Sequence, residues 1–275
     1  MTQSNSLELI TNSNGAVGAF NVILIEHAEA LAKAAEMANT GIVLQISENC
    51  VSYHGSLKPI SVATKAIVDA SPQPLSLHLD HAESVDLIKD ALDLGFDSIM
   101  YDGSKLDFRE NVAISKKVAS LCRQYSATIE VELGEVGGKD GVHAPGARTK
   151  PSEAKAFVEE TGVDLLAVAV GTSHGQITRD TSLDLDLIRE LTNTVKTPLV
   201  LHGSSGVSDD NLRKAVEAGM RKINIATHLN HVFTDEIKAF FASDQNSVDP
   251  RKYMKNARSA VASETARLIA LLDLR

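Results

Sequence analysis

Eight short apolar segments recur along this chain, each followed by a turn and an amphipathic stretch, and this alternation limits the fold more than any other feature. The segments are rich in Val, Ile and Leu, a composition typical of parallel strands that helices cover on both faces. The predicted strands lie at residues 16–23, 42–47, 75–81, 98–102, 128–133, 165–171, 199–202 and 222–226.

The stretches between these strands have the periodicity of helices. Gly95, Gly162 and Gly219 each stand shortly before a strand, as glycines that end helices do. The predicted helices span residues 26–39, 84–94, 107–125, 152–160, 184–194, 209–218 and 234–241, and a further helix covers 253–272.

Eight strand–helix units in sequence predict an α/β fold, the closed (β/α)8 TIM barrel. The alternative is an open doubly wound sheet, which often carries a G-x-G-x-x-G motif after its first strand, and this chain lacks one there. The length of 275 residues fits one barrel, since such barrels take about 250 residues. We therefore expect a single TIM-barrel domain over residues 1–275, with an extra C-terminal helical tail at about 249–275.

Composition and charge exclude several classes of partner. The net charge is −9 and the basic residues form no run, which argues against nucleic acid and anionic membranes as partners. No apolar run approaches the roughly 18 residues of a membrane span, and the first residues lack the basic start of a secretory signal. Cys50 and Cys122 form no C-x-x-C pair, so we expect a reduced, cytoplasmic setting.

Polar residues gather where the predicted strands end, and catalytic groups of TIM barrels lie at those ends. Of the nine histidines, His81, His174 and His202 lie at the ends of strands three, six and seven. They would converge at one mouth of the barrel, and three imidazoles with an open fourth position form a typical catalytic zinc site. The competing interpretation is chance, because a lone histidine is more often structural than a ligand.

Carboxylates accompany these histidines. Asp80 precedes His81, but alternation along a strand would send two neighbouring side chains to opposite faces. Both serve one site only if the strand twists out of register at its tip, and Asp80 can then exchange a proton with a substrate hydroxyl. Asp102 and Glu132 end strands four and five, where they either support the ligand histidines, form a second metal position or cap the following helices.

Two segments indicate phosphate binding. H-G-S-S-G at 202–206 follows strand seven, and N-I-A-T at 224–227 ends strand eight. Loops at these positions of a TIM barrel commonly bind phosphate through backbone N–H groups and a helix N-terminus. The glycine-rich segment 134–149 is either a lid over the mouth or an ordinary surface loop.

These motifs, in this order, resemble the class II, zinc-dependent fructose- and tagatose-bisphosphate aldolases over nearly the whole chain. The matching segments are A-F-N (19–21), H-L-D-H (78–81), Y-D-G-S (101–104), E-V-E-L-G (130–134), V-G-T-S-H-G (170–175), L-H-G-S-S-G (201–206) and K-I-N-I-A-T (222–227).

The resemblance implies a role for each matching position. His81, His174 and His202 match the zinc ligands, and Asp80 matches the catalytic acid/base at the C4 oxygen. Asp102 and Glu132 match carboxylates associated with an alternative metal position. The implied substrate-binding residues are Asn21, Ser47, Gly175, Gly203, Ser204, Ser205, Asn224, Ile225, Ala226, Thr227 and Arg258.

Within that set, Ser47 and Arg258 look like contacts for the distal phosphate, and the others from Gly175 to Thr227 match the groups that hold the dihydroxyacetone phosphate half. Because the family's arginine reaches across from a neighbouring subunit, Arg258 implies a homodimer or homotetramer. Ala226 stands where many fructose-bisphosphate aldolases have an acid, which resembles the tagatose branch. Asp140 is the nearest candidate for the loop acid that moves the C3 proton in relatives.

The expected reaction is retro-aldol cleavage of tagatose or fructose 1,6-bisphosphate to dihydroxyacetone phosphate and glyceraldehyde 3-phosphate, with zinc as Lewis acid and a monovalent cation as a further option. Three alternatives stay open at this point. They are an aldolase for a related ketose phosphate, a metal-dependent sugar-phosphate isomerase or epimerase, and a sugar-phosphate-binding protein without turnover.

Overall fold

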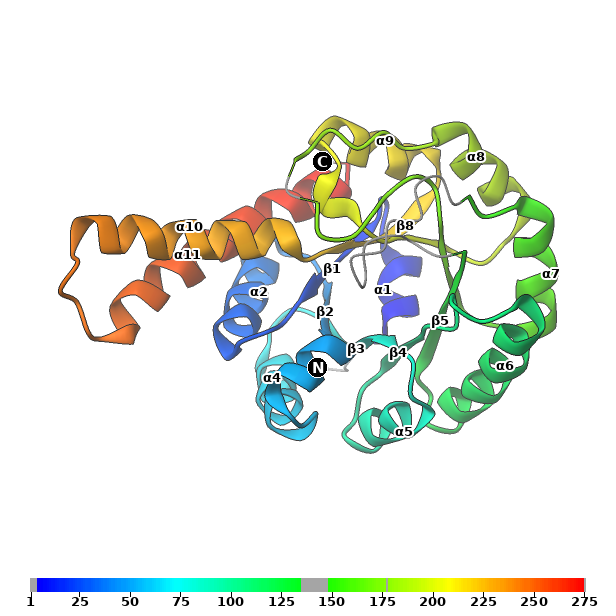
Figure 1. Ribbon diagram of the computed structural model, residues 1–275, viewed down its shortest axis with the longest axis horizontal. Coiled ribbons are helices and arrows are strands. Elements are labelled where there is room, and N and C mark those ends of the chain that lie inside the picture. The colour runs from blue at the N-terminus through cyan, green and yellow to red at the C-terminus, as the bar shows by residue number, and fades with distance from the viewer. Residues whose placement is uncertain (1–3, 135–147, 177, 275) are drawn as a thin grey trace.

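Eight parallel strands close into a barrel in which each strand pairs with its neighbours in sequence and β8 pairs with β1. A computed structural model describes residues 4–134, 148–176 and 178–274 (Figure 1). The strands are β1 (Val17–Asn21), β2 (Ile42–Ser47), β3 (Leu75–Ala82), β4 (Ser98–Tyr101), β5 (Thr128–Leu133), β6 (Leu165–Val168), β7 (Leu199–Leu201) and β8 (Met220–Ile225). The (β/α)8 TIM barrel is therefore confirmed, with each strand close to its predicted position.

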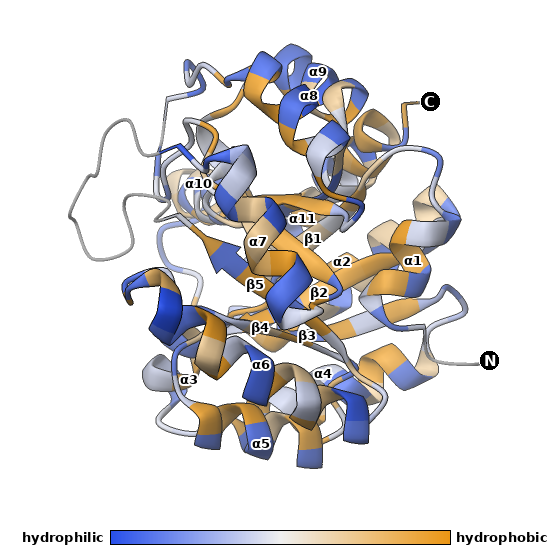
Figure 2. Cartoon of the chain, turned by 90° about the vertical axis from the view of Figure 1, so that its right-hand side faces the viewer, coloured by the Kyte–Doolittle hydropathy of each residue, from blue (hydrophilic) through white to orange (hydrophobic). Residues whose placement is uncertain are grey.

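Helices surround this barrel with their apolar faces turned inward, and Figure 2 shows polar residues on the outer faces of the ring. The helices are α1 (Ser6–Asn12), α2 (Ile25–Ala38), α3 (Glu48–His54), α4 (Lys58–Ala70), α5 (Val85–Asp93), α6 (Phe108–Gln124), α7 (Pro151–Thr161), α8 (Leu185–Thr194), α9 (Asp209–Ala218), α10 (Thr227–Ser243) and α11 (Pro250–Leu272), and a short 3-10 turn, η1, covers Ser204–Gly206. None of the described helices has both the length and the apolar character that a membrane crossing requires.

Three helices lie where the sequence pattern predicts none, namely α1, α3 and α4. The segment that forms α4 is rich in β-branched residues such as Ile60, Val62 and Thr64, and these residues weaken the helical signal because they lose side-chain freedom in a helix. Packing of Ile60, Thr64 and Val68 into the core outweighs this weak propensity.

The inside of the barrel is divided into an apolar half and a polar half. Side chains of α1, among them Leu9 and Ile10, pack with Val17, Val43 and Val200 at the end where the strands begin. Toward the ends of the strands the buried interior residues are polar, and they comprise Gln45, His78, Asp80, Glu130, Glu132, His202, Lys222 and Asn224. The apolar half closes the bottom of the barrel, so chemistry is confined to its upper mouth.

Helices α10 and α11 form a hairpin that projects away from the barrel (Figure 1). The expected extra C-terminal helix is α11, which packs along α2 and α10. Helix α10 begins at Thr227, directly after β8, rather than at residue 234 as the sequence pattern predicts. Its N-terminus therefore stands at the barrel mouth.

Candidate active site

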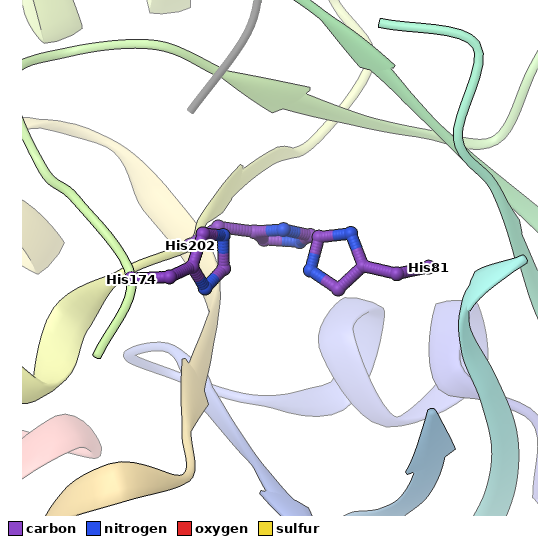
Figure 3. Close-up of side chains that lie close together, drawn as sticks. All are labelled: His81, His174 and His202. Atoms are coloured by element: carbon purple, nitrogen blue, oxygen red, sulfur yellow. The ribbon is translucent and has the colours of Figure 1, made fainter. Parts of the chain in front are cut away.

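Three histidine rings meet at the mouth of the barrel. His81 is the last residue but one of β3, His174 lies in the loop after β6, and His202 follows β7. Their ring centroids are 4.6 to 5.9 Å apart, and each ring offers a nitrogen within 4.8 Å of the others. Figure 3 shows His81 approaching from one side and His174 and His202 from the other. The structure thus brings together the three histidines expected to hold a metal ion.

A bulge at the end of β3 allows Asp80 and His81 to face the same cavity. The register between β3 and β4 shifts between Leu79 and Ala82, and His81 has a φ of 51°. This left-handed backbone conformation turns His81 away from the alternating pattern of an extended strand. Both side chains consequently line the cavity, as the functional interpretation of the sequence required.

Neighbouring carboxylates fix the orientation of two of the rings. Asp102 lies 2.8 Å from Nδ1 of His81, and Glu130 lies 2.9 Å from Nε2 of His202. A carboxylate accepts a hydrogen bond from the ring nitrogen that carries the proton. The other nitrogens, Nε2 of His81 and Nδ1 of His202, are therefore the ones directed at the common space. Nδ1 of His202 is buried and makes no hydrogen bond with the described residues, which fits a metal ligand.

The carboxylates around His202 favour positive charge at this point. Burial alone would lower the pKa of His202, but the neighbouring carboxylates of Glu130 and Glu132 raise it to about 9. Glu132 Oε2 lies 3.4 Å from Nδ1 of His202 and 3.9 Å from Nδ1 of His81. His81, Asp102 and Glu132 also form a group with metal-ligand spacing. The donor set of imidazoles and carboxylates therefore fits a divalent ion, either at the three rings or beside them.

Asp80 is surrounded by amide groups. Asn21 and Gln45 each donate to Oδ2 at 3.3 Å, and Asn224 donates to Oδ1 at 3.3 Å. Burial raises the pKa of Asp80 above its ordinary value, although His202 and Lys222 oppose that effect. Oδ1 also lies 3.9 Å from Nε2 of His81. The carboxyl group of Asp80 is fixed by hydrogen bonds, has a raised pKa and lies next to the three histidines. Such a group is suited to exchanging a proton with the hydroxyl of a bound molecule.

The opposite part of the cavity is lined by small residues and by the start of a helix. Gly175, Gly203, Ser204, Ser205, Ala226 and Thr227 line it. Helix α10 starts here, and its N-cap residue Ala226 has no side chain that can satisfy the first N–H groups of the helix. The N–H of His228 donates to Oγ of Ser205 at 3.3 Å, and the positive end of the helix dipole lies at this cavity wall, which suits an anion.

The cavity measures about 450 Å³ and contains residues that the sequence pattern did not single out. They are Gln45, Glu48, Asn49, Ser52, Glu83 and Lys105. Gln45 stands two residues before Ser47 and is therefore on the same face of β2, a period-two signal that was available in the sequence. Glu48, Asn49 and Ser52 belong to the unpredicted helix α3, so nothing in the strand pattern pointed to them.

Two expected site residues lie elsewhere, and a third falls outside the part of the chain that the structure describes. Ile225 has its side chain in the hydrophobic core between two cavity residues. Arg258 is on α11, where it pairs with Glu29 of α2, and it does not line the cavity of its own chain. Asp140 lies outside the described residues, so its role stays a prediction.

A barrel that gathers three histidine rings, buried carboxylates and a glycine- and serine-lined cavity wall at the ends of its strands has the architecture of an α/β-barrel enzyme. The family model for class-II fructose-bisphosphate aldolase matches residues 2–274. The chain therefore belongs to the class II fructose-bisphosphate aldolase family and is a carbon–carbon lyase.

Solved structures agree with this assignment. The chain is similar to the YdjI aldolase from Escherichia coli K12, at 28% identity with a TM-score of 0.86, covering 98% of this chain and 97% of that one. It is also similar to a putative fructose-1,6-bisphosphate aldolase from Coccidioides immitis, at 27% identity and a TM-score of 0.86, covering 98% and 96%. Fructose-bisphosphate aldolase from Campylobacter jejuni, at 21% identity, a TM-score of 0.80 and coverage of 96% and 91%, shares the fold.

Proposed function

We propose that this chain catalyses the zinc-dependent retro-aldol cleavage of a ketose 1,6-bisphosphate, tagatose or fructose 1,6-bisphosphate, to dihydroxyacetone phosphate and glyceraldehyde 3-phosphate. One observation carries the proposal. The buried carboxyl of Asp80 stands 3.9 Å from Nε2 of His81, in a cavity whose other wall is the N-terminus of α10.

Asp80 supplies the proton chemistry that cleavage needs. It takes the proton of the C4 hydroxyl as the C3–C4 bond breaks, and the electron pair of that bond moves toward the C2 carbonyl. Asn21, Gln45 and Asn224 hold the carboxyl in place through their amide N–H groups. A positioned general acid/base typically contributes about 10²–10⁴-fold to the rate.

A divalent ion bound by His81, His174 and His202 would supply a Lewis acid next to the carbonyl oxygen. The anion site at α10 orients the substrate, because its N–H groups bind the phosphate on C1 and so place C2 to C4 between the three rings and Asp80. The spacing between the two parts of the cavity thus decides which carbon–carbon bond breaks.

A cleavage assay tests the proposal directly. Purified enzyme is given tagatose and fructose 1,6-bisphosphate and the matching 1-phosphates, with zinc or with a chelator, and triose phosphate release is followed by a coupled reaction. We expect turnover that the chelator abolishes and zinc restores. Interconversion of ketose phosphates without triose phosphate would instead indicate an isomerase or epimerase, and zinc binding without any turnover would indicate a binding protein.

Two variants separate metal binding from acid/base chemistry. His174→Ala should lose zinc and cleavage together, whereas Asp80→Ala should keep zinc and lose about 10²–10⁴-fold in kcat. His54→Ala is the matched control, since His54 is exposed and its Nε2 contacts the main chain at Ile23. Full cleavage activity in metal-free His174→Ala would contradict the proposal.

A related ketose 1-phosphate is a second candidate substrate, supported by the far end of the cavity. Lys105 there forms an ion pair with Glu83 at 3.0 Å, and Glu48 accepts a hydrogen bond from the N–H of Glu83 at 2.7 Å. The carboxylates of Glu83 and Glu48 can accept hydrogen bonds from substrate hydroxyl groups, and the ammonium group of Lys105 can bind a second phosphate. This end of the cavity therefore suits either kind of substrate. The ratio of kcat/KM values for bisphosphate and 1-phosphate substrates decides between the two.

The proposal includes a homodimer or homotetramer. In it, Arg258 contacts the distal phosphate of the substrate that is bound in a neighbouring subunit. The projecting α10–α11 hairpin, which carries Arg258, supports this assembly. Sedimentation equilibrium measures the assembly state. If Arg258 acts in a neighbouring site, Arg258→Ala raises KM for the bisphosphate more than for the 1-phosphate.

A further inference from the structure

A lysine without a role in the proposed chemistry lies under the site. Lys222 is on β8 inside the barrel, and its side chain is completely buried. A buried ammonium is unfavourable unless it is paired, and an apolar residue of similar volume often stabilises a core as well or better. Its presence therefore indicates a task other than packing.

The first contact of Lys222 leads to a metal ligand. Nζ donates to Oε2 of Glu130 at 2.8 Å, and Oε1 of the same carboxylate lies 2.9 Å from Nε2 of His202. One oxygen of Glu130 binds Lys222 and the other binds His202. The lysine therefore fixes the plane of the carboxylate that the histidine contacts. Nε2 of His202 then carries the hydrogen, and the lone pair of Nδ1 is directed at His81 and His174.

The second contact leads to Asp80. Nζ donates to Oδ1 of Asn224 at 2.9 Å, and Nδ2 of Asn224 donates to Oδ1 of Asp80 at 3.3 Å. Lysine has only donors, so it can accept no hydrogen bond from the amide. Lys222 therefore sets the orientation of the Asn224 amide, with its oxygen down and its NH2 group up toward the carboxylate.

We infer that Lys222 is a positioning residue that orders the metal site and the acid/base together, through Glu130 to His202 and through Asn224 to Asp80. This inference rests on the proposed function for the roles of His202 and Asp80. It goes beyond that function by assigning both halves of the site to one buried group that touches neither substrate nor metal.

A double-mutant cycle on zinc affinity tests the first branch. Lys222→Met should raise the zinc Kd about 10–100-fold, the usual effect of losing the support behind a ligand. In a Glu130→Gln background the same substitution should change the Kd by well under tenfold, because only the contact of Asn224 Nδ2 with Nε2 of His202 at 3.2 Å still connects Lys222 to the ring. Competition with a chromophoric chelator measures Kd without any turnover. The matched control Lys214→Met changes an exposed lysine of α9 and should leave Kd unchanged.

The second branch is tested by kcat at saturating zinc. Lys222→Met should lower kcat about tenfold or more in both backgrounds, since the path through Asn224 does not pass through Glu130. KM should change less than kcat, because neither Lys222 nor Glu130 lines the cavity. A structural role alone would reduce the amount of folded protein and leave kcat per bound zinc intact.

Clear outcomes overturn the inference. A zinc Kd for Lys222→Met within twofold of the parent value does so, and so does an unchanged kcat. If the single variant does not fold because Glu130 is left as an unpaired buried charge, the pair Glu130→Gln and Lys222→Met/Glu130→Gln decides. A change in Kd of well under tenfold together with a lower kcat in the double variant supports the inference, and any other result contradicts it. The measurement of zinc Kd tests the branch through Glu130 even if the enzyme cleaves no ketose phosphate.

Discussion

His81 has a backbone conformation that strands normally avoid. Its φ of 51° lies in the left-handed region, which costs a residue with a Cβ about 1–2 kcal/mol. The other described non-glycine residues with positive φ, Asn39, Ser126 and Leu274, follow the ends of helices, where such a conformation is common. Only His81 adopts it inside a strand. Strain of this kind concentrates at functional sites, and here it places a metal ligand beside Asp80.

Asp102 should control how tightly His81 binds zinc. Its Oδ2 accepts from Nδ1 of His81 at 2.8 Å, so Asp102→Asn should weaken the hold on the ring and raise the zinc Kd about 10–100-fold. The measurement is the chelator competition described for Lys222. Asp90→Asn, an exposed aspartate on α5, serves as the control. An unchanged Kd would mean that His81 is oriented by something other than this carboxylate.

His27 should make the fold sensitive to mild acid. Burial lowers its pKa to about 4, and Nδ1 of the ring accepts a hydrogen bond from the N–H of Leu24. An unfolded chain protonates this ring near 6.5, so the unfolded state binds more protons between pH 6.5 and 4 and stability falls as pH falls through that window. The loss is about 2 kcal/mol by pH 5.

Urea denaturation at pH 7 and pH 5, with chelator present, checks this value. His27→Gln should lose less stability than the parent protein between the two pH values, by about 2 kcal/mol. His54→Gln is the control, because His54 is exposed. Equal pH dependence in the parent and His27→Gln would show that His27 is not the group responsible.

At the scale of the elements, the strands were predictable and several helices were not. Period-two alternation places Gln45 with Ser47, Glu130 with Glu132 and Lys222 with Asn224 on one face of each strand, so the polar half of the barrel could have been inferred from the sequence. The bulge in β3 could not, because it depends on pairing with β4 and not on the residues of β3 alone. The cavity wall from α3 was hidden for a similar reason, since a helix of 7 residues has little periodicity of its own.

The loop after β7 depends on a glycine that other residues cannot replace. Gly203 has a φ of 64°, and a Cβ there would meet the main-chain carbon and oxygen of Ser173 at 2.8 and 2.9 Å. Gly175 has a φ of 72° but open space around it. Gly203→Ala should therefore cost about 1–3 kcal/mol more than Gly175→Ala, which carries only the backbone cost of roughly 1 kcal/mol.

Urea denaturation of the metal-free variants gives this difference. We expect Gly203→Ala to be the less stable variant because the main chain of Ser173 cannot move aside as a flexible side chain can. That main chain leads directly into His174. If both variants are equally stable, the loop between β6 and α8 yields more readily than its contacts with Gly203 indicate.

At the scale of the whole molecule, closure of the barrel creates the site. His81, His174 and His202 belong to different strand–helix units and meet because β1 to β8 form one closed ring. The order of motifs predicted that meeting, whereas the projection of α10 and α11 from the barrel followed from no pattern in the sequence. Helix α1 closes the apolar end of the barrel, so the polar interior residues and the three histidines lie toward its other end.

A metal ion at this point should link the stability of all three units. Because the unfolded chain cannot present the three rings together, zinc binds mainly the folded state, and free zinc at about 1,000 times its Kd adds about 4 kcal/mol to the free energy of unfolding. Chelation should remove that increment while the helical circular dichroism of the barrel persists. In His174→Ala the increment should shrink sharply although the metal-free stability changes little, since His174 lies in a loop. An increment of the same size in that variant would place the stabilising ion elsewhere, and the three rings would then not be its site.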